Sequence, residues 1–291
     1  MKKHIYYIGL IALSLGLVAC GKEAPAESIE DEIMPEISIE TQTETGGATT
    51  EQVVDQEPEP VILEATHVGG FTISGDRLTA RGGAYDQDGN TDNGAEPIDW
   101  IVIADDGDHL LLLSEKVLEQ KEFNAQYTET SWETCTLRTW LNGDFYNAAF
   151  NDEEKSIILD YPTVAGDVSA GTSDVSDKVF LLSEGEAEAY IGAEEGTPGN
   201  KLCSKVTTRA INAGVWYITE DYYDLFGFKA KGFSDEMIGC GNWWLRTNGK
   251  DATRVMDVGA SGIIRTTGHE AASHQDGVRP AIYIQISGGN N

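Results

Sequence analysis

The segment from Gly239 to Ile286 places the strongest constraint on how this chain can fold. It opens with two adjacent tryptophans, Trp243 and Trp244, and a four-residue turn is predicted to divide two short strands. Its sequence Gly-Val-Arg-Pro at 277–280 then leads into a closing apolar strand. Adjacent residues of a strand point to opposite faces, so we expect one tryptophan in the core and the other beside a surface groove. The rest of the chain is predicted to be a scaffold that holds this segment and an anchor that holds the scaffold to a membrane.

The first 20 residues have the features of a secretory leader. Two lysines precede an apolar run from Ile5 to Val18, and about 14 residues at about 1.5 Å each are too few to cross a bilayer core of about 30 Å. The run ends in Leu-Val-Ala-Cys followed by glycine, which resembles the lipobox of bacterial lipoproteins, whose cysteine is diacylated and becomes the new N-terminus. We therefore predict a lipoprotein signal peptide over residues 1–20, lipidation of Cys20, and a lipid anchor on the extracytoplasmic face of the cell membrane. An ordinary signal peptide with a chance cysteine is the alternative.

An acidic linker is predicted from residue 21 to residue 66. Glutamate and aspartate alternate there with Ser, Thr, Pro and Ala, and no aromatic residue occurs. Such a segment buries too little apolar area to offset the entropy of ordering, so we expect a disordered stalk that like charges extend. Recruitment of a basic partner is the alternative role. The remaining residues, 67–287, have the length of a single globular domain.

The formal net charge of −29 argues against binding to nucleic acids and against direct contact with an anionic membrane surface. Phosphate backbones bind clustered lysine and arginine, and the sequence has 20 such residues against 49 acidic ones, with no basic cluster. We therefore predict no nucleic-acid binding, and contact with the membrane only through the lipid anchor.

Three cysteines follow Cys20, at positions 135, 203 and 240. An odd number outside the cytoplasm allows at most one disulfide among them. Cys203 and Cys240 are the more plausible pair, because Cys135 lies in a helical pattern beside core residues. Three unpaired, partly buried thiols are the alternative. No Cys-x-x-Cys or Cys-x-x-His spacing indicates a metal site.

The domain is predicted to mix strands and helices, which places it in the α+β class. An Asp-Gly turn joins two apolar runs into a hairpin, and the leucine-rich second strand should be covered on both faces. Capping boxes, in which Asn or Ser is followed three residues later by Glu, start two helices. The aromatic-rich residues 217–239 are interpreted as a loop. The predicted elements are strands at 70–73, 98–103, 109–113 and 179–182 and helices near 137–145, 151–159, 183–190 and 206–213.

Five ordered motifs carry a resemblance to a known family: Gly94–Trp100 (GAEPIDW), Trp132–Asn142 (WETCTLRTWLN), Asp177–Ser183 (DKVFLLS), Trp243–Arg246 (WWLR) and Gly277–Ala281 (GVRPA). Together they resemble the bacterial family known as domain of unknown function 6273, which is common in secreted proteins and has no established activity. The threonine after Arg246 departs from the Arg-Ser-Pro that this family more often has.

A weaker resemblance extends to C-type-lectin-like domains, including the formylglycine-generating enzyme family, whose closing segments also run from a Trp/Arg strand to a Gly-x-Arg strand. The resemblance implies a C-type-lectin-like domain with small mixed or antiparallel sheets and flanking helices, preceded by the disordered stalk. That enzyme family binds copper through two cysteines near the end of its domain. Cys240 has no nearby partner in the sequence, so neither that activity nor a cofactor is expected.

Two polar segments resemble metal sites only in part. Residues 86–94 carry oxygen ligands at alternate positions, but their glycines are fourth and ninth, whereas a calcium loop of the EF-hand type has glycine sixth. An Asx-rich turn is the favoured interpretation. His269 and His274 are five residues apart, whereas a helical zinc motif places them four apart, and neighbouring glycines disfavour a helix. We therefore predict no metal site.

The residues expected to bind ligand surround the polar segment 247–276, which should form loops on a rigid frame. No Gly-x-Ser-x-Gly elbow indicates a nucleophile. The favoured function is a non-catalytic cell-surface module that binds a glycan or a surface protein; an extracytoplasmic enzyme of hydrolytic type and a structural envelope lipoprotein are the alternatives. Arg246 and Arg279 could recognise an anionic ligand, but internal pairing with carboxylates or backbone carbonyls explains them more readily. The candidate ligand-binding residues are Trp243, Trp244, Arg246, Arg265, His269, His274 and Arg279.

Overall fold

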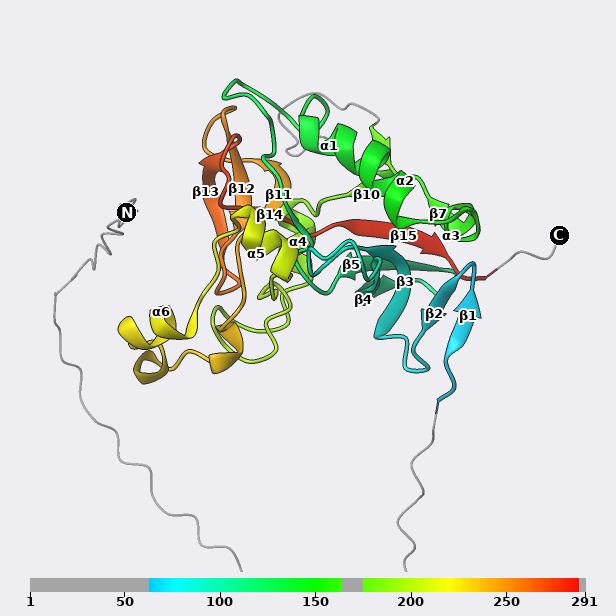
Figure 1. Cartoon of the computed structure of the whole chain (residues 1–291), viewed down its shortest axis with the longest axis horizontal. Coiled ribbons are helices and arrows are strands. Elements are labelled where there is room, and N and C mark those ends of the chain that lie inside the picture. The colour runs from blue at the N-terminus through cyan, green and yellow to red at the C-terminus, as the bar shows by residue number, and fades with distance from the viewer. Residues whose placement is uncertain (1–62, 164–174, 288–291) are drawn as a thin grey trace, which may run out of the picture. The chain divides into compact units, whose positions relative to one another are not determined.

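The computed structural model describes residues 63–163 and 175–287 (Figure 1). The predicted signal peptide with Cys20 lies outside the described residues, as does the predicted linker up to residue 62. The last predicted linker residue, Thr66, already belongs to the first strand. Among the described residues, no helix has the length and apolar character needed to cross a membrane.

The described chain alternates between strands and short helices, which confirms the predicted α+β class. The strands are β1 Thr66–Val68, β2 Phe71–Ile73, β3 Thr79–Tyr85, β4 Glu96–Asp105, β5 His109–Ser114, β6 Glu119–Gln120, β7 Ile158–Leu159, β8 Tyr161–Pro162, β9 Ser176–Asp177, β10 Val179–Phe180, β11 Trp243–Asn248, β12 Arg254–Val258, β13 Ile264–Glu270, β14 Gly277–Val278 and β15 Ala281–Gln285. The helices are α1 Thr136–Trp140, the π-helical turn η1 Leu141–Phe145, α2 Tyr146–Ala149, α3 Asp152–Ile157, α4 Glu184–Ala189, α5 Thr208–Ala213, α6 Glu220–Leu225, and the 3-10 turns η2 Lys229–Lys231 and η3 Asp235–Met237.

The larger sheet has eight strands in the order β1-β2-β3-β4-β5-β15-β10, with β7 pairing beside β15. Its centre is the predicted hairpin of β4 and β5, to which the closing strand β15 is added antiparallel from Ala281 opposite Leu113 to Gln285 opposite His109. The four leucines of β5 are all buried, so this strand is covered on both faces as expected. Figure 1 shows β15 running through the middle of the domain, far in sequence from the strands beside it.

The second sheet has five strands in the order β13-β12-β11-β14-β6, and its β11–β14 pair is parallel. The prediction that residues 247–276 form loops is wrong, because β12 and β13 occupy much of this segment and Val255 and Val258 are fully buried. Gly268 permits the close pairing: its φ is +69°, and a Cβ there would lie 2.4 Å from the carbonyl oxygen of Val255. Both predicted capping boxes are present, at Asn151 with Glu154 and at Ser183 with Glu186.

The aromatic-rich region 217–239 is more regular than predicted. Helix α6 begins where Thr219 accepts a hydrogen bond from the backbone of Tyr222, and two 3-10 turns follow. Its rings pack mainly on one another, which gives the region a small core of its own beside the main one. The loop interpretation was therefore wrong, because side chains meeting in space rather than a helical period stabilise this segment.

The prediction that one tryptophan of β11 lines a surface groove is also wrong. Trp243 and Trp244 are both 0% exposed. Trp243 donates its indole N–H to the carbonyl of Leu202 at 3.0 Å, and Trp244 donates to the carbonyl of Lys121 at 2.9 Å. The two faces of β11 are each covered by a different connecting segment, so alternation along the strand does not expose either ring.

The three cysteines of the described residues are free thiols, which is the second of the two predicted alternatives, but the pair expected to form a disulfide lies close together. Cys135 is buried at the N-terminus of α1, whereas the Sγ atoms of Cys203 and Cys240 lie 2.8 Å apart as free thiols. The hydrogen bond from the Cys203 thiol lowers the pKa of the Cys240 thiol, which favours the thiolate that attacks in disulfide formation.

We expect the full-length chain purified in air to carry a Cys203–Cys240 disulfide, the two thiols giving up two protons and two electrons to dissolved oxygen. Alkylation of the denatured, unreduced chain and peptide mass mapping should label Cys135 and leave the other two unlabelled. The bond closes a loop spanning 37 positions, so Cys240→Ser should lower the free energy of unfolding by about 3–4 kcal/mol. Cys135→Ser is the control that should keep the bond, and labelling of Cys203 and Cys240 in the parent chain would contradict the pairing.

Candidate functional site

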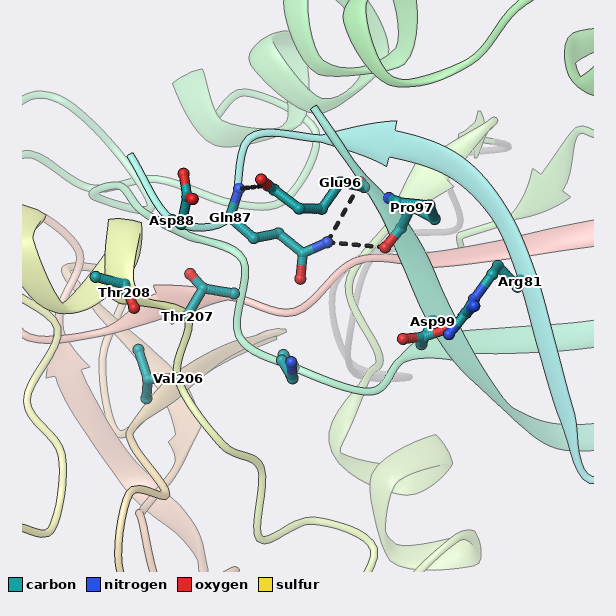
Figure 2. Close-up of a pocket in the computed structure, with 10 residues that line it drawn as sticks. Arg81, Gln87, Asp88, Glu96, Pro97, Asp99, Val206, Thr207 and Thr208 are labelled. Carbon is teal, nitrogen blue, oxygen red and sulfur yellow. Dashed lines mark hydrogen bonds and ion pairs between the residues drawn. The ribbon is translucent and has the colours of Figure 1, made fainter. Parts of the chain in front are cut away.

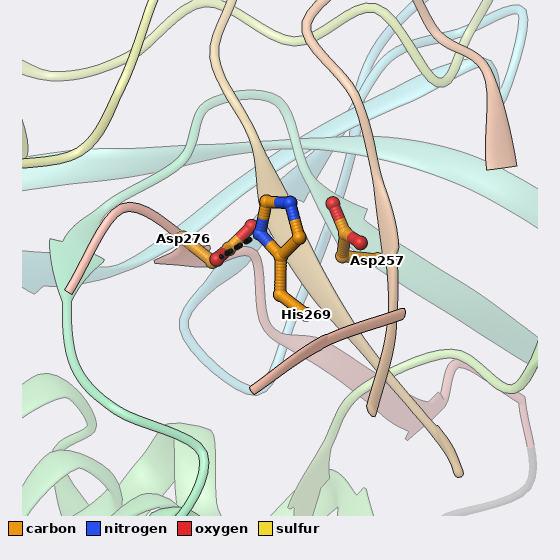
Figure 3. A group of neighbouring side chains, drawn as sticks. All are labelled: Asp257, His269 and Asp276. Atoms are coloured by element: carbon orange, nitrogen blue, oxygen red, sulfur yellow. Dashed lines mark hydrogen bonds and ion pairs between the residues drawn. The ribbon is translucent and has the colours of Figure 1, made fainter. Parts of the chain in front are cut away.

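A cluster of charged side chains lies between β12, β13 and the residue before β14 (Figure 3). Asp257 of β12 accepts hydrogen bonds from Arg265 of β13, with Nε at 2.7 Å from Oδ2. His269 of β13 has its Nδ1 2.8 Å from Oδ2 of Asp276. Both carboxylate side chains are 0% exposed, whereas the side chains of Arg265 and His269 are 30% and 29% exposed. The cluster is thus a buried acidic pair reached from the surface by one cation and one imidazole.

Strand pairing places these residues. Asp257 lies opposite Arg265 in the β12–β13 pair, and the register shifts between this pair and Val255 opposite His269. Such a bulge turns side chains toward positions that a regular ladder does not allow. Asp276 is held from the other side, because Ser273 donates its hydroxyl to the Oδ2 of this carboxylate at 2.9 Å.

The electrostatic environment of the cluster favours the protonated forms of Asp257 and His269. Burial of Asp257 and the charge of Asp276 raise the pKa of Asp257 to about 7, against the opposing effect of Arg265 and His269. The hydrogen bond to Asp276 raises the pKa of His269. Among the described residues, Oδ1 of Asp257 and Oδ1 of Asp276 have no hydrogen-bond partner although both are buried.

A surface hollow adjoins the cluster on the side of His269. It has a volume of about 230 Å³, and its lining residues are all polar: Arg254, His269, Glu270, Ser273 and Gln275. The guanidinium of Arg254 donates to the carbonyl of Gly268 at 3.0 Å, which fixes one wall. His269 therefore connects the buried carboxylates with a solvent-accessible polar surface.

Two of the predicted ligand-binding arginines have internal partners. Arg246 pairs with Glu186, with Nη2 at 2.9 Å from Oε1, and Arg279 donates to the carbonyls of Ser114 at 2.8 Å and Lys201 at 2.9 Å. Burial lowers the pKa of Arg279 to about 9, so it stays charged at neutral pH. Both arginines are buried, which supports the structural role that internal pairing predicted and excludes direct contact with a ligand in this conformation.

The structure brings together Arg265 and His269 from the predicted set. His274 is 72% exposed, pairs with Glu122 at 2.8 Å, and does not line the hollow. Sequence reasoning missed Asp257 and Asp276. The available signals were an aspartate between the apolar residues of a strand and an aspartate directly before the Gly-Val-Arg-Pro sequence.

The acidic loop at residues 86–94 forms the predicted Asx turns. Asp86 accepts from the backbone of Gly89 at 2.7 Å, and Asp88 from that of Asn90 at 2.7 Å. Carboxylate oxygens of Asp86, Asp88 and Glu96 lie within 4.8 Å of one another. Arg209 also pairs with Asp86 at 2.8 Å, so one of these carboxylates already has a cationic partner.

A larger hollow of about 440 Å³ lies beside this loop (Figure 2). Its polar groups bond mainly to one another: Arg81 pairs with Asp99 at 2.6 Å, and the Gln87 side chain donates to the carbonyl of Pro97 at 2.9 Å. Figure 2 shows these pairs along its wall. The smaller hollow at His269 is the stronger candidate, because it alone of these two adjoins buried carboxylate oxygens without partners.

Residues 107–286 match the model of the family described as Domain of unknown function (DUF6273), and the chain belongs to this family. The match confirms the resemblance carried by the sequence motifs, although the first motif, Gly94–Trp100, lies before the matched range. The whole cluster around Asp257 lies inside it. No curated protein and no solved structure matches the chain.

The raised pKa of Asp257 predicts a pH dependence of stability. A carboxyl group whose pKa is about 7 when folded and about 3.9 when unfolded contributes full stability below pH 3.9, and this contribution is lost as the pH rises through 7. In metal-free buffer with EDTA, the free energy of unfolding should therefore fall by about 2–4 kcal/mol more between pH 4 and pH 7.5 in the parent chain than in Asp257→Asn. Denaturant titrations across this range measure the difference, and parallel pH profiles for the two chains would contradict it.

Proposed function

We propose that this protein is a lipid-anchored cell-surface module that binds a ligand without catalysis, and that the ligand occupies the hollow at His269. The hollow supports this proposal because β12 and β13 supply a rigid frame and its five lining residues are all polar. Arg254 and Glu270 stand on its rim 3.8 Å apart, so donor and acceptor groups are both available to a ligand.

The composition of the hollow favours a glycan over a protein surface. Protein interfaces depend on apolar and aromatic anchors that fill pockets, and none is among the residues that line this hollow. Planar groups such as those of Arg254, Glu270 and Gln275 suit the adjacent hydroxyl groups of a sugar, since each offers two hydrogen-bonding atoms.

An extracytoplasmic enzyme is the second candidate, and one observation favours it. A carboxyl group with a pKa of about 7 is suited to general acid–base catalysis near neutral pH. The Asp257 side chain is fully buried, however, so a substrate in the hollow cannot contact it. This burial is why we place binding first and hydrolysis second, with a structural envelope role as the remaining alternative.

We also propose that the domain is a variant of the C-type-lectin-like fold. The arrangement in support is a closing strand, β15, within the main sheet, together with a second small sheet built largely from the C-terminal segment. The lipid anchor is proposed from the lipobox that ends at Cys20.

A glycan array and a pulldown of surface proteins with the full-length chain test the binding function. Ala substitutions at Arg254 and Gln275 should each weaken binding about tenfold, equivalent to about 1.4 kcal/mol, because both side chains line the hollow. His274→Ala is the matched control, since its side chain is exposed in the same connection but lies off the hollow, and it should bind normally. If all three variants bind the identified ligand with equal affinity, the binding site lies elsewhere. If the parent chain retains neither a glycan nor a protein, a structural role is favoured.

Replacement of Cys20 tests the anchor. Cys20→Ala should shift the protein from the membrane fraction to the medium or leave an uncleaved precursor, because two acyl chains provide stable anchoring. Fractionation and metabolic labelling with fatty acid measure both outcomes. Labelling that persists at the parent level in the variant would show that Cys20 is not the lipidated residue.

A further inference from the structure

The carboxylates of Asp257 and Asp276 form a buried pair whose hydrogen bonding is incomplete. Both side chains are fully buried, and Oδ1 of each has no hydrogen-bond partner among the described residues. The guanidinium of Arg265 is 3.6 Å from Oδ1 of Asp276, beyond ordinary hydrogen-bond distance. Buried carboxylate oxygens without partners are costly in a folded protein, so the pair favours a cation that both of these oxygens can contact.

His269 supplies a third donor to the same point. One donor atom from each of Asp257, His269 and Asp276 lies within 4.8 Å of the other two, and Figure 3 shows the imidazole between the two carboxylates. Donors on one zinc ion, each at about 2.0–2.2 Å from it, lie about 3–4 Å from one another, so small side-chain rotations bring these atoms onto one ion. One imidazole and two carboxylates suit a first-row transition metal, whereas calcium takes six to eight oxygens.

We propose that Asp257, His269 and Asp276 bind a divalent transition-metal ion such as Zn²⁺, which takes the place of the guanidinium of Arg265. With the guanidinium in place, Oδ1 of each carboxylate has no hydrogen-bond partner in the described part of the chain, and a divalent ion can bind these oxygens directly. The Arg265 side chain is 30% exposed and can therefore turn toward solvent. His269 lines the hollow, which gives the ion a route of entry. The proposed metal site departs from the prediction of no metal, and it does not depend on what the hollow binds.

The site differs from the histidine motif that the sequence suggested. His274 is turned toward Glu122 and Glu270 is exposed, so neither belongs to the three donors. The ligands come instead from two neighbouring strands and the turn before β14, which no spacing rule along the chain detects.

Calorimetric titration of the full-length chain, stripped with EDTA and then dialysed, tests the proposal with Zn²⁺ as the probe. We expect one ion per chain and a rise in Tm of about 5 °C or more at 100-fold excess over Kd. Asp257→Asn and Asp276→Asn keep the side-chain shape and should each weaken affinity at least about tenfold. Asp251→Asn removes an exposed carboxylate from the turn between β11 and β12, and it should leave affinity unchanged.

The variant Arg265→Gln tells a metal site apart from a cluster whose charged side chains only pair with one another. If the ion replaces the guanidinium, this variant should be less stable than the parent chain without metal, bind Zn²⁺ about tenfold more tightly, and recover its Tm when Zn²⁺ is added. Visible absorption of Co²⁺ in the same variant gives a readout that does not depend on stability. Absence of Zn²⁺ binding, binding unaffected by both Asn variants, or unchanged affinity in Arg265→Gln would overturn the proposal.

Discussion

Arg279 connects the two sheets of the domain. It lies between β14, which belongs to the five-stranded sheet, and β15, which belongs to the eight-stranded sheet. Its guanidinium donates to the carbonyls of Ser114 and Lys201 and lies 5.0 Å from the ring of Trp243. A buried guanidinium that lost these partners would be strongly destabilising, which explains in physical terms why the sequence Gly-Val-Arg-Pro closes the domain.

The candidate site depends on the same connection. Gly277 pairs with Trp243, and the next residue of β11, Trp244, pairs with Asp257. Asp276 directly precedes Gly277, so the strand that Arg279 secures also sets this carboxylate beside Asp257. The acidic pair is therefore built into the strand pairing, whereas Arg265 and His269 reach it with partly exposed side chains. The two carboxylates are thus held by the sheet, whereas the guanidinium that a metal ion would replace is partly exposed.

Local signals in the sequence predicted local structure well. The capping boxes at Asn151 and Ser183 and the hairpin of β4 and β5 were predicted correctly, because neighbouring residues determine each of them. The burial of both Trp243 and Trp244 was not predicted, because the residues that cover the second face of β11 are far away along the chain. Arg265 and His269 were selected as loop residues but lie on a strand. Their acidic partners become visible only when the sheet is assembled.

We propose that a metal ion completes the buried aspartate pair. Diffraction from crystals of the full-length chain grown with Zn²⁺, recorded at the zinc absorption edge, tests it most directly. We predict an anomalous peak about 2.0–2.2 Å from donor atoms of Asp257, His269 and Asp276, with the Arg265 side chain turned toward solvent. A map with no peak at this position, and with Arg265 still paired to Asp257, would contradict the claim.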